Sequence, residues 1–257
     1  MLIRVTSECS QGCKHCLVDA KKKGIHMTMK TFQDTIDLAN RIGTKMILIS
    51  GGEPTEAPLY HDYMEWAIKH YNGTIAVATH GMFISNLDEL NDKIGRYKKY
   101  PILFQVVNDK RYYPKQIDKT AARRAMLKYP RLKVMWRLGG QGDGLYPQGR
   151  AVKMLGSSPE NTESIGSKCF NLRSIVHSGQ TFYQAVRTLE GFAKFCTPSI
   201  NPDGTISMGE SSECERVANI YTSNEEITEI IKASQCNLCG MVSTTSPMHQ
   251  IAIRFLG

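Results

Sequence analysis

The sequence lacks the features of membrane and secreted proteins. Its 257 residues contain no run of about 18 or more apolar residues, so we expect no transmembrane helix. No charged and then apolar leader precedes the first cysteine, at position 9, so we expect no signal peptide and a cytoplasmic location. Because 41% of the residues are apolar, the chain is not disordered, and it is long enough to bury a core without disulfides.

Signatures of nucleic-acid binding are also missing. The chain has no zinc-finger pattern, no RNA-recognition signature and no basic stripe interleaved with aromatic residues. It is nevertheless basic, with 32 Lys and Arg against 24 Asp and Glu and a net charge of +8. The basic residues stand in short clusters, such as 21–23 and 123–124, which are typical of a solvated surface. An acidic partner, either an anionic peptide, a nucleotide or a nucleic acid, remains the alternative.

The sequence contains a regular alternation of strand and helix patterns, without internal repeats or low-complexity segments. Apolar runs predict strands over residues 2–6, 45–50, 74–79, 102–107 and 133–138. Amphipathic periodicity predicts helices over residues 28–42, 60–71, 87–97 and 118–129. This alternation predicts an α/β fold with a parallel sheet. Polar or glycine-rich residues follow nearly every strand, which favours a partial (β/α)6 TIM-like barrel over an open doubly wound sheet, since barrels build their sites from those loops.

The pattern changes in the last third of the chain. A sixth strand is expected near residues 172–177. We expect a domain boundary near residue 190, which divides the chain into a barrel over 1–190 and a small cysteine-rich module over 191–257. Within the module, residues 196–208 predict a hairpin with a turn at Asn-Pro-Asp-Gly. A helix is expected to begin at Ser223, which starts a capping box.

Eight cysteines indicate metal or redox chemistry, because disulfides are rare in cytosolic proteins. Three of them form the spacing Cys9-x3-Cys13-x2-Cys16 directly after the first expected strand. An iron–sulfur cube normally has four thiolate ligands, so a compact group of three favours a [4Fe–4S] cluster with one open iron. A zinc site completed by His15 or by a distant residue is the alternative.

The cysteine loop after the first strand, followed by Gly51-Gly52-Glu53-Pro54 after the second, resembles the radical S-adenosylmethionine (SAM) superfamily over about residues 1–140. The resemblance implies that the three cysteines bind a [4Fe–4S] cluster whose open iron is chelated by SAM. It also implies that SAM is cleaved reductively to a 5′-deoxyadenosyl radical, which removes a hydrogen atom from the substrate.

The resemblance further implies a set of cofactor-binding residues. In the superfamily the Gly-Gly-Glu segment receives the amino group of SAM, and an aromatic residue usually precedes the last cysteine, where His15 stands here. Polar residues at the ends of later strands add further SAM contacts. The matching residues are His15, Ser50, Gly51, Gly52, Glu53, Thr79, Asn108 and Arg137.

Four later cysteines form two pairs, which alone would suit either zinc or a second [4Fe–4S] cluster. The first pair and its glycine resemble the opening half of the SPASM auxiliary-cluster domain, in the truncated one-cluster form called a twitch domain. This resemblance implies an auxiliary [4Fe–4S] cluster. The ligands would be Cys196, Cys214, Cys236 and Cys239.

The sequence indicates the substrate less clearly than the cofactor. No catalytic residue is assigned. The remaining Cys169 is interpreted, in descending order, as a buried thiol, a replacement ligand, or a hydrogen donor to a substrate radical. In the resembling families an auxiliary cluster accompanies crosslinking, dehydrogenation or epimerisation of peptides, so we favour a peptide or protein substrate. A small molecule, or a nucleotide, nucleoside or RNA, remains open, and so does a non-catalytic zinc-binding protein. The expected protein partner is an electron donor such as flavodoxin or ferredoxin.

Overall fold

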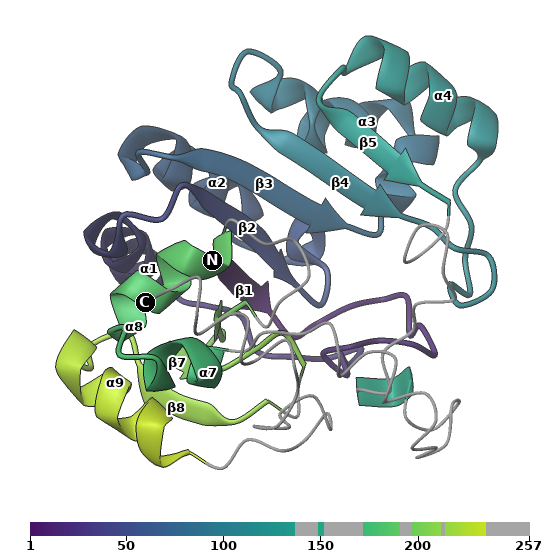
Figure 1. Cartoon of the computed structure of the whole chain (residues 1–257). Helices are drawn as coiled ribbons and strands as arrows, with labels where there is room; N and C mark the ends of the chain where they lie inside the picture. The colour runs from purple at the N-terminus through teal and green to yellow at the C-terminus, as the bar shows by residue number, and fades with distance from the viewer. Residues whose placement is uncertain (137–148, 152–171, 191–196, 212–213, 235–257) are drawn as a thin grey trace.

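The computed structural model describes residues 1–136, 149–151, 172–190, 197–211 and 214–234. Parallel strands alternate with helices through the first 136 residues (Figure 1). The strands are β1 (Leu2–Thr6), β2 (Met46–Gly51), β3 (Thr74–Thr79), β4 (Leu103–Val107) and β5 (Leu132–Met135). The helices are α1 (Met29–Ile42), α2 (Tyr60–His70), α3 (Leu87–Lys93) and α4 (Lys119–Lys128). The predicted α/β fold with a TIM-type parallel sheet is therefore confirmed, with element bounds that differ by only a few residues.

The first helix shows why the sequence folds as it does. The Thr28 side chain accepts a hydrogen bond from the Thr31 amide and caps the start of α1. Phe32, Ile36 and Ala39 lie on one face at helical spacing and are fully buried. Gly43 ends the helix at φ 75°, a left-handed conformation that glycine adopts without strain.

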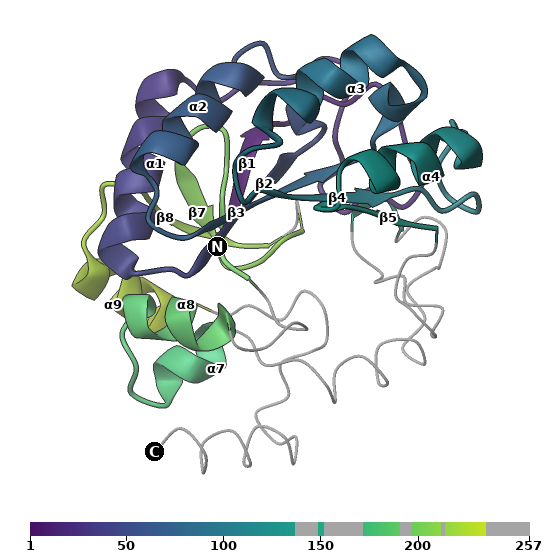
Figure 2. The ribbon, with the colours of Figure 1, turned by 90° about the horizontal axis from the view of Figure 1, so that it is seen from above.

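Side chains on the two faces of the sheet have different surroundings. The helices α1 to α4 lie together on one side of the sheet (Figure 2). Ile49, Val77 and Phe104 are register partners on β2, β3 and β4, and all three are buried. The opposite face carries Ala78, Gln105 and Lys133, which are register partners on β3, β4 and β5. Gln105 and Lys133 are exposed there. The inner face of β4 and β5 therefore exposes both polar and apolar side chains, since Leu103 and Met135 are exposed on it as well.

The expected sixth strand is wrong. Residues 172–177 form a helix, α7 (Leu172–His177), and α8 (Phe182–Glu190) follows it. Leu172, Ile175 and Val176 are all buried, which matches the helical spacing i, i+3, i+4. Such a short apolar run carries no periodicity that separates a strand from a helix, and the β-branched residues favoured the wrong choice.

The predicted hairpin is present as β6 (Ser199–Ile200) and β7 (Thr205–Ser207), and it extends the barrel sheet. β6 pairs in parallel with β1, and β8 (Arg216–Asn219) follows β7. The order across the sheet is β5-β4-β3-β2-β1-β6-β7-β8. The division of the chain near residue 190 stays a prediction.

The helix predicted from Ser223 is α9 (Asn224–Ala233), and the Ser223 side chain accepts a hydrogen bond from the Glu226 amide at 3.1 Å. α9 packs against α7 and α8, and α8 also contacts α1. In the part of the chain that the structure describes, no helix has the length and apolar character needed to cross a membrane.

Candidate functional site

The three clustered cysteines lie on one loop that leaves the carboxyl end of β1. The loop closes on itself, because the Ser7 amide donates to the Ile25 carbonyl at 2.9 Å and the Cys9 amide donates to the Lys21 carbonyl at 2.8 Å. Cys13 is 8% exposed, whereas Cys9 and Cys16 are half-buried. The Ala20 amide donates to the Cys16 sulfur at 3.3 Å. The backbone therefore holds the cysteines in a defined arrangement.

The thiols lie near enough to affect one another. Burial raises the pKa of Cys9 to about 11 and that of Cys13 to about 12, and for Cys13 the negative charges of Cys9 and Cys16 add to the rise. Three coupled, partly buried thiolates need a cation to compensate them, and soft thiolates suit iron–sulfur clusters or zinc. The donor set therefore fits the cluster that the sequence predicts.

The predicted glycines at the end of β2 pack against this loop. The Gly52 amide donates to the Thr6 carbonyl and the Glu53 amide donates to the Glu8 carbonyl, both at 2.7 Å. A Cβ atom on Gly52 would lie 2.1 Å from the Glu8 carbonyl oxygen, and one on Gly51 would lie 2.3 Å from that of Thr6. Backbone atoms of Thr6 and Glu8 therefore fill the space beside the two glycines on this side.

Glu53 connects the ends of β2 and β3. It is 1% exposed, and its carboxylate accepts hydrogen bonds from the hydroxyls of Thr55 and Thr79, both at 2.6 Å. It also accepts one from the His80 amide at 2.7 Å and one from the Thr55 amide at 3.1 Å. Four donors hold this buried carboxylate in one position and satisfy its oxygens. Of the predicted cofactor-binding residues, Glu53 and Thr79 are thus brought into direct contact. Ser50 lies on β2, one residue before its end.

Glu56 extends this network to the cysteine loop. Its carboxylate accepts from the Ser10 amide at 2.9 Å and the Ser10 hydroxyl at 2.5 Å, and it lies 3.0 Å from His80 Nε2. Burial acts to lower the pKa of His80, but the carboxylates of Glu53 and Glu56 outweigh it and the pKa is raised. The ligand atoms of Cys9, Glu56 and His80 all lie within 4.8 Å of one another. An imidazole and a carboxylate therefore border the cysteine site.

Asn108, another predicted SAM contact, holds the loop after β4. Its side-chain oxygen accepts from the Ile117 amide at 3.1 Å, and its nitrogen donates to the Lys115 carbonyl at 3.3 Å. The same loop brings Tyr112 and Tyr113 against His15, with ring centroids 5.2 and 4.9 Å apart. Burial lowers the pKa of His15 to about 4, so the ring is neutral and packs as an aromatic side chain at physiological pH.

Sequence reasoning missed Arg150 in this site. Its Nε donates to the Cys13 carbonyl and its Nη1 to the Ala20 carbonyl, both at 2.8 Å. Arg150 lies 137 positions after Cys13 and 130 after Ala20, so no local spacing reveals the contact.

Most of the predicted second cysteine cluster, and two further candidates, fall beyond the described ranges. Of the four expected ligands, only Cys214 is described, between β7 and β8. Its loop is tied to β1, because the Arg4 guanidinium donates to the carbonyls of Gly209 and Glu210. The residues outside the description are Arg137, Cys169, Cys196, Cys236 and Cys239.

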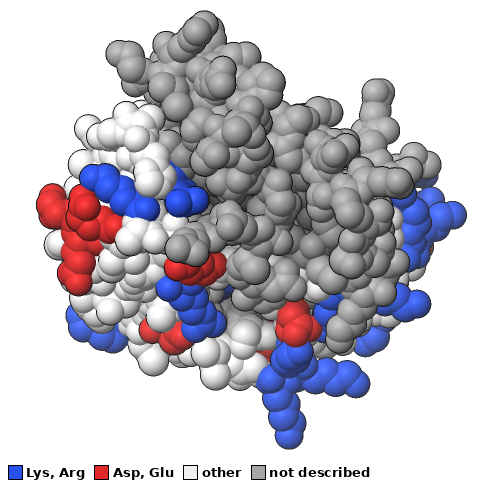
Figure 3. Space-filling view, turned by 60° about the horizontal axis from the view of Figure 1, so that its bottom comes forward, with Lys and Arg blue, Asp and Glu red and all other residues white. Residues whose placement is uncertain are grey.

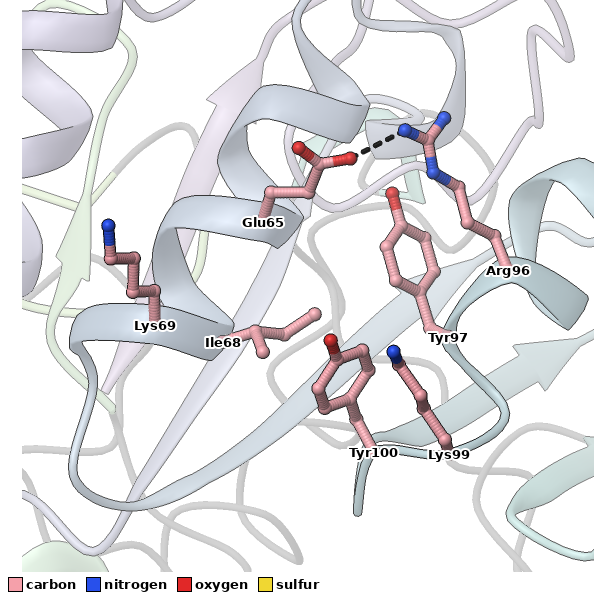
Figure 4. Close-up of a pocket in the computed structure, with 7 residues that line it drawn as sticks. All are labelled: Glu65, Ile68, Lys69, Arg96, Tyr97, Lys99 and Tyr100. Carbon is pink, nitrogen blue, oxygen red and sulfur yellow. Dashed lines mark hydrogen bonds and ion pairs between the residues drawn. The ribbon is translucent and has the colours of Figure 1, made fainter.

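A separate pocket of about 590 Å³ lies between α2 and the segment 95–100 that precedes β4 (Figure 4). Glu65 and Arg96 form an ion pair across it at 2.6 Å, and Lys69 and Lys99 border it. Barrel enzymes carry their chemistry at the carboxyl ends of the strands, and this pocket lies before the start of β4. We therefore place the candidate site at the cysteine loop.

The radical SAM superfamily model matches residues 3–129. Over 82 residues the chain is 30% identical to mycofactocin maturase MftC of Mycobacterium ulcerans (strain Agy99). That match covers 32% of this chain and 22% of the maturase, so the chain matches about a fifth of the length of this curated relative.

Three solved structures are similar in fold. BtrN, in complex with AdoMet and 2-DOIA, has a TM-score of 0.60 at 12% identity, covering 93% of this chain and 85% of that one. SuiB of Streptococcus suis, bound to the precursor peptide SuiA, has 0.57 at 12% identity, covering 93% and 65%. The anSMEcpe enzyme, with bound AdoMet and the Cp18Cys peptide, has 0.51 at 15% identity, covering 89% and 79%. Identities this low support a shared fold only.

Proposed function

Because residues 3–129 form a radical SAM domain, we propose that this protein is an enzyme that cleaves SAM reductively at a [4Fe–4S] cluster held by Cys9, Cys13 and Cys16. When bound, the cluster supplies the electron that converts SAM to methionine and a 5′-deoxyadenosyl radical, which abstracts a substrate hydrogen atom. The observation that carries this proposal is the closed cysteine loop hydrogen-bonded to the Gly52-Glu53 segment.

Two buried groups of the cysteine loop support a bound cofactor. Gln11 Nε2 and His15 Nδ1 are buried and have no hydrogen-bond partner among the described residues. An unpaired buried donor is costly, and a ligand atom is one way to satisfy it. Both residues belong to the loop that carries the cysteines, so these groups fit a cofactor bound beside it.

The remaining residues of the proposed SAM site would bind SAM or hold the segments that bind it. Glu53, fixed by four donors, holds the ends of β2 and β3 together beside the Gly51-Gly52 backbone, whose carbonyl groups are acceptors for an ammonium. We assign the SAM amino group to this segment. The flanking contacts are assigned to His15, Ser50, Thr79, Asn108 and Arg137.

The test is the reaction itself. Protein reconstituted with iron and sulfide without oxygen should carry about two clusters' worth of iron and should form 5′-deoxyadenosine from SAM with dithionite. The product is measured by chromatography and mass spectrometry. Cluster-loaded protein that forms none would refute the proposed activity, and protein that binds zinc but no iron would favour the non-catalytic alternative.

We also propose an auxiliary [4Fe–4S] cluster in the module over residues 191–257, bound by Cys196, Cys214, Cys236 and Cys239. Its support is the placement of the Cys214 loop. Arg4 of β1 donates to the Gly209 carbonyl at 3.4 Å, and the Ser199 hydroxyl donates to the same oxygen at 2.8 Å. The Cys214 loop is thus anchored to the barrel sheet beside the β1 strand that leads into the first cysteine loop.

A peptide is the proposed substrate. SuiB and anSMEcpe are peptide-bound in the similar structures, and MftC is a maturase, whereas BtrN supports a small molecule as the second candidate. The inner wall of β4 and β5, with exposed Leu103, Gln105 and Lys133, offers apolar, amide and cationic groups to such a substrate. In Figure 3, Asp and Glu side chains stand beside Lys and Arg at the left and the bottom of the view, whereas the Lys and Arg side chains at its right edge stand without acidic neighbours.

The proposed electron donor is an acidic protein such as flavodoxin or ferredoxin, and the cysteine loop itself carries exposed Lys22 and Lys23. Reversing both charges (Lys22→Glu, Lys23→Glu) should slow donor-dependent formation of 5′-deoxyadenosine by roughly tenfold at low salt, because charge complementarity sets association rates. With dithionite the rate should stay unchanged.

The matched control reverses another adjacent, exposed basic pair, Arg123 and Arg124 on α4. We expect the control to leave the donor-dependent rate near that of the unaltered protein. Equal slowing by both double variants, or a slowing that does not fade as salt screens the charges, would place the donor elsewhere.

A further inference from the structure

Arg150 touches the cysteine loop at four places. Its amide donates to the Cys16 carbonyl at 3.0 Å, and its guanidinium donates to the carbonyls of Cys13 and Ala20, both at 2.8 Å. Its Nη1 also lies 3.6 Å from the Asp19 carboxylate. Three of these partners are main-chain carbonyls within residues 13–20. One residue from the segment after β5 therefore fixes the backbone at and after two cysteines.

The residue before it is matched to the same surface. Gly149 has φ 58°, a left-handed conformation that few other residues adopt without cost. A Cβ atom there would lie 2.3 Å from the Cys16 carbonyl oxygen and 2.6 Å from that of Leu17. Both the conformation and the space require glycine, so Gly149 and Arg150 approach the cysteine loop as one unit.

We propose that Gly149 and Arg150 form a clamp that holds the cysteine loop in its ligand geometry, with Arg150 as a positioning residue for the cluster. This inference rests on the proposed cluster site. It adds residues that hold the loop in place, which the spacing of the three cysteines does not reveal. Groups that orient metal ligands typically change metal affinity by 10–100-fold when removed. Without the guanidinium, the carbonyls of Cys13 and Ala20 lose the hydrogen bonds from Arg150, and the loop gains alternative conformations.

The guanidinium also places a positive charge beside the thiolates. Its Nε lies 2.8 Å from the carbonyl oxygen of Cys13, one of the proposed ligands. A cation next to an anionic cluster stabilises its more negative, reduced state. The clamp therefore has two separable effects, one on retention of the cluster and one on its reduction potential.

The experiment compares cluster retention in the full chain without SAM. Reconstituted wild type, Arg150→Ala, Arg150→Lys and Gly149→Ala are exposed to an iron chelator, and loss of the visible absorbance is followed. We expect about tenfold faster loss in Arg150→Ala. Arg150→Lys should be intermediate, because one ammonium keeps the charge but cannot reproduce the guanidinium fork. Arg96→Ala, an exposed ion-pair variant in the segment before β4, should behave as wild type.

A second readout separates this role from a general effect on folding. The midpoint potential of the retained cluster should fall in Arg150→Ala and stay near that of wild type in Arg150→Lys. Metal-free Arg150→Ala and Arg150→Lys should keep one cooperative urea transition at a slightly lower midpoint, because the hydrogen bonds to Cys13 and Ala20 are lost or weakened. Equal retention and equal potential in wild type and Arg150→Ala would overturn the clamp. If Arg150→Ala does not fold, Arg150→Lys and Gly149→Ala provide the test. Both must then lose the cluster faster than wild type. Wild type that takes up no cluster would refute the proposed function instead.

Discussion

Replacing Cys13 by alanine should remove the cluster and 5′-deoxyadenosine formation together. Cys13 is the most buried of the three clustered cysteines, and its thiol carries the higher of the two raised pKa values in the group, about 12 against about 11 for Cys9. A thiol with this pKa stays protonated unless a metal displaces the proton. Cys13 is therefore expected to become a thiolate only when it binds the metal cluster. Cys9 and Cys16 alone would not hold a [4Fe–4S] cluster, which needs at least three cysteine ligands here.

The measurements are iron and sulfide per chain, the visible absorbance of the cluster, and product formed with dithionite. Urea unfolding of the metal-free variant should be nearly unaltered, since Cys13→Ala removes one small buried atom. Cys239→Ala serves as the matched control. It should lose part of the iron but keep SAM cleavage, with damage seen only in substrate turnover. If Cys13→Ala cleaved SAM at the rate of the control, the assignment of the cluster to this loop would be wrong.

The local part of this site was predictable from the sequence. The cysteine spacing lies within eight residues, and the Gly51-Gly52-Glu53 segment follows the next strand of a parallel sheet. Because β1 and β2 are neighbours, the two segments had to meet at the same edge, and the amide of Gly52 indeed bonds to Thr6. The order of strands and helices over residues 1–136 was equally predictable from the sequence, because each element is long enough to show its hydrophobic pattern.

What could not be predicted depends on contacts between distant parts of the chain. Arg150 reaches the Cys13 carbonyl across 137 positions, and His80 meets Glu56 through a turn after β3. Neither pair has a spacing that would single it out. The prediction of a strand over residues 172–177 was wrong for another reason. A segment of six residues fits a strand and a helix equally well, and only its packing against α8 and α9 decides between them.

The cysteine loop is held by hydrogen bonds on two sides, so it has little freedom to move away from Gly51 and Gly52. Glu56, backed by His80, binds Ser10 beside Cys9. Arg150 binds the carbonyls at Cys13 and Ala20 from the other side. Between them the loop rests directly on the Gly51-Gly52 backbone, without intervening side chains. Any atom added at that contact must move the loop, since both of its flanks are fixed.

Gly52→Ala should therefore be among the most destabilising single changes in the barrel. The new Cβ atom would lie 2.1 Å from the Glu8 carbonyl oxygen and 2.6 Å from its carbon, and backbone atoms cannot rotate away as a side chain can. Overpacking of this kind costs about 1–3 kcal/mol. Parting the strands also weakens the hydrogen bonds from Gly52 to Thr6 and from Glu53 to Glu8, each worth about 1 kcal/mol.

We expect a loss of about 3–5 kcal/mol in the free energy of unfolding of the metal-free chain, measured by urea denaturation, and weaker cluster binding because Glu8 adjoins Cys9. Gly179→Ala is the control, since Gly179 has φ 101° but no heavy atom within 4 Å of an added Cβ. Its cost is backbone strain alone, about 1–2 kcal/mol. Gly52 has no such positive φ, so its excess over the control measures the contact with the cysteine loop. A Gly52→Ala variant no less stable than Gly179→Ala would show that the loop can withdraw from β2, and the rigid support proposed for Cys9 would then be lost.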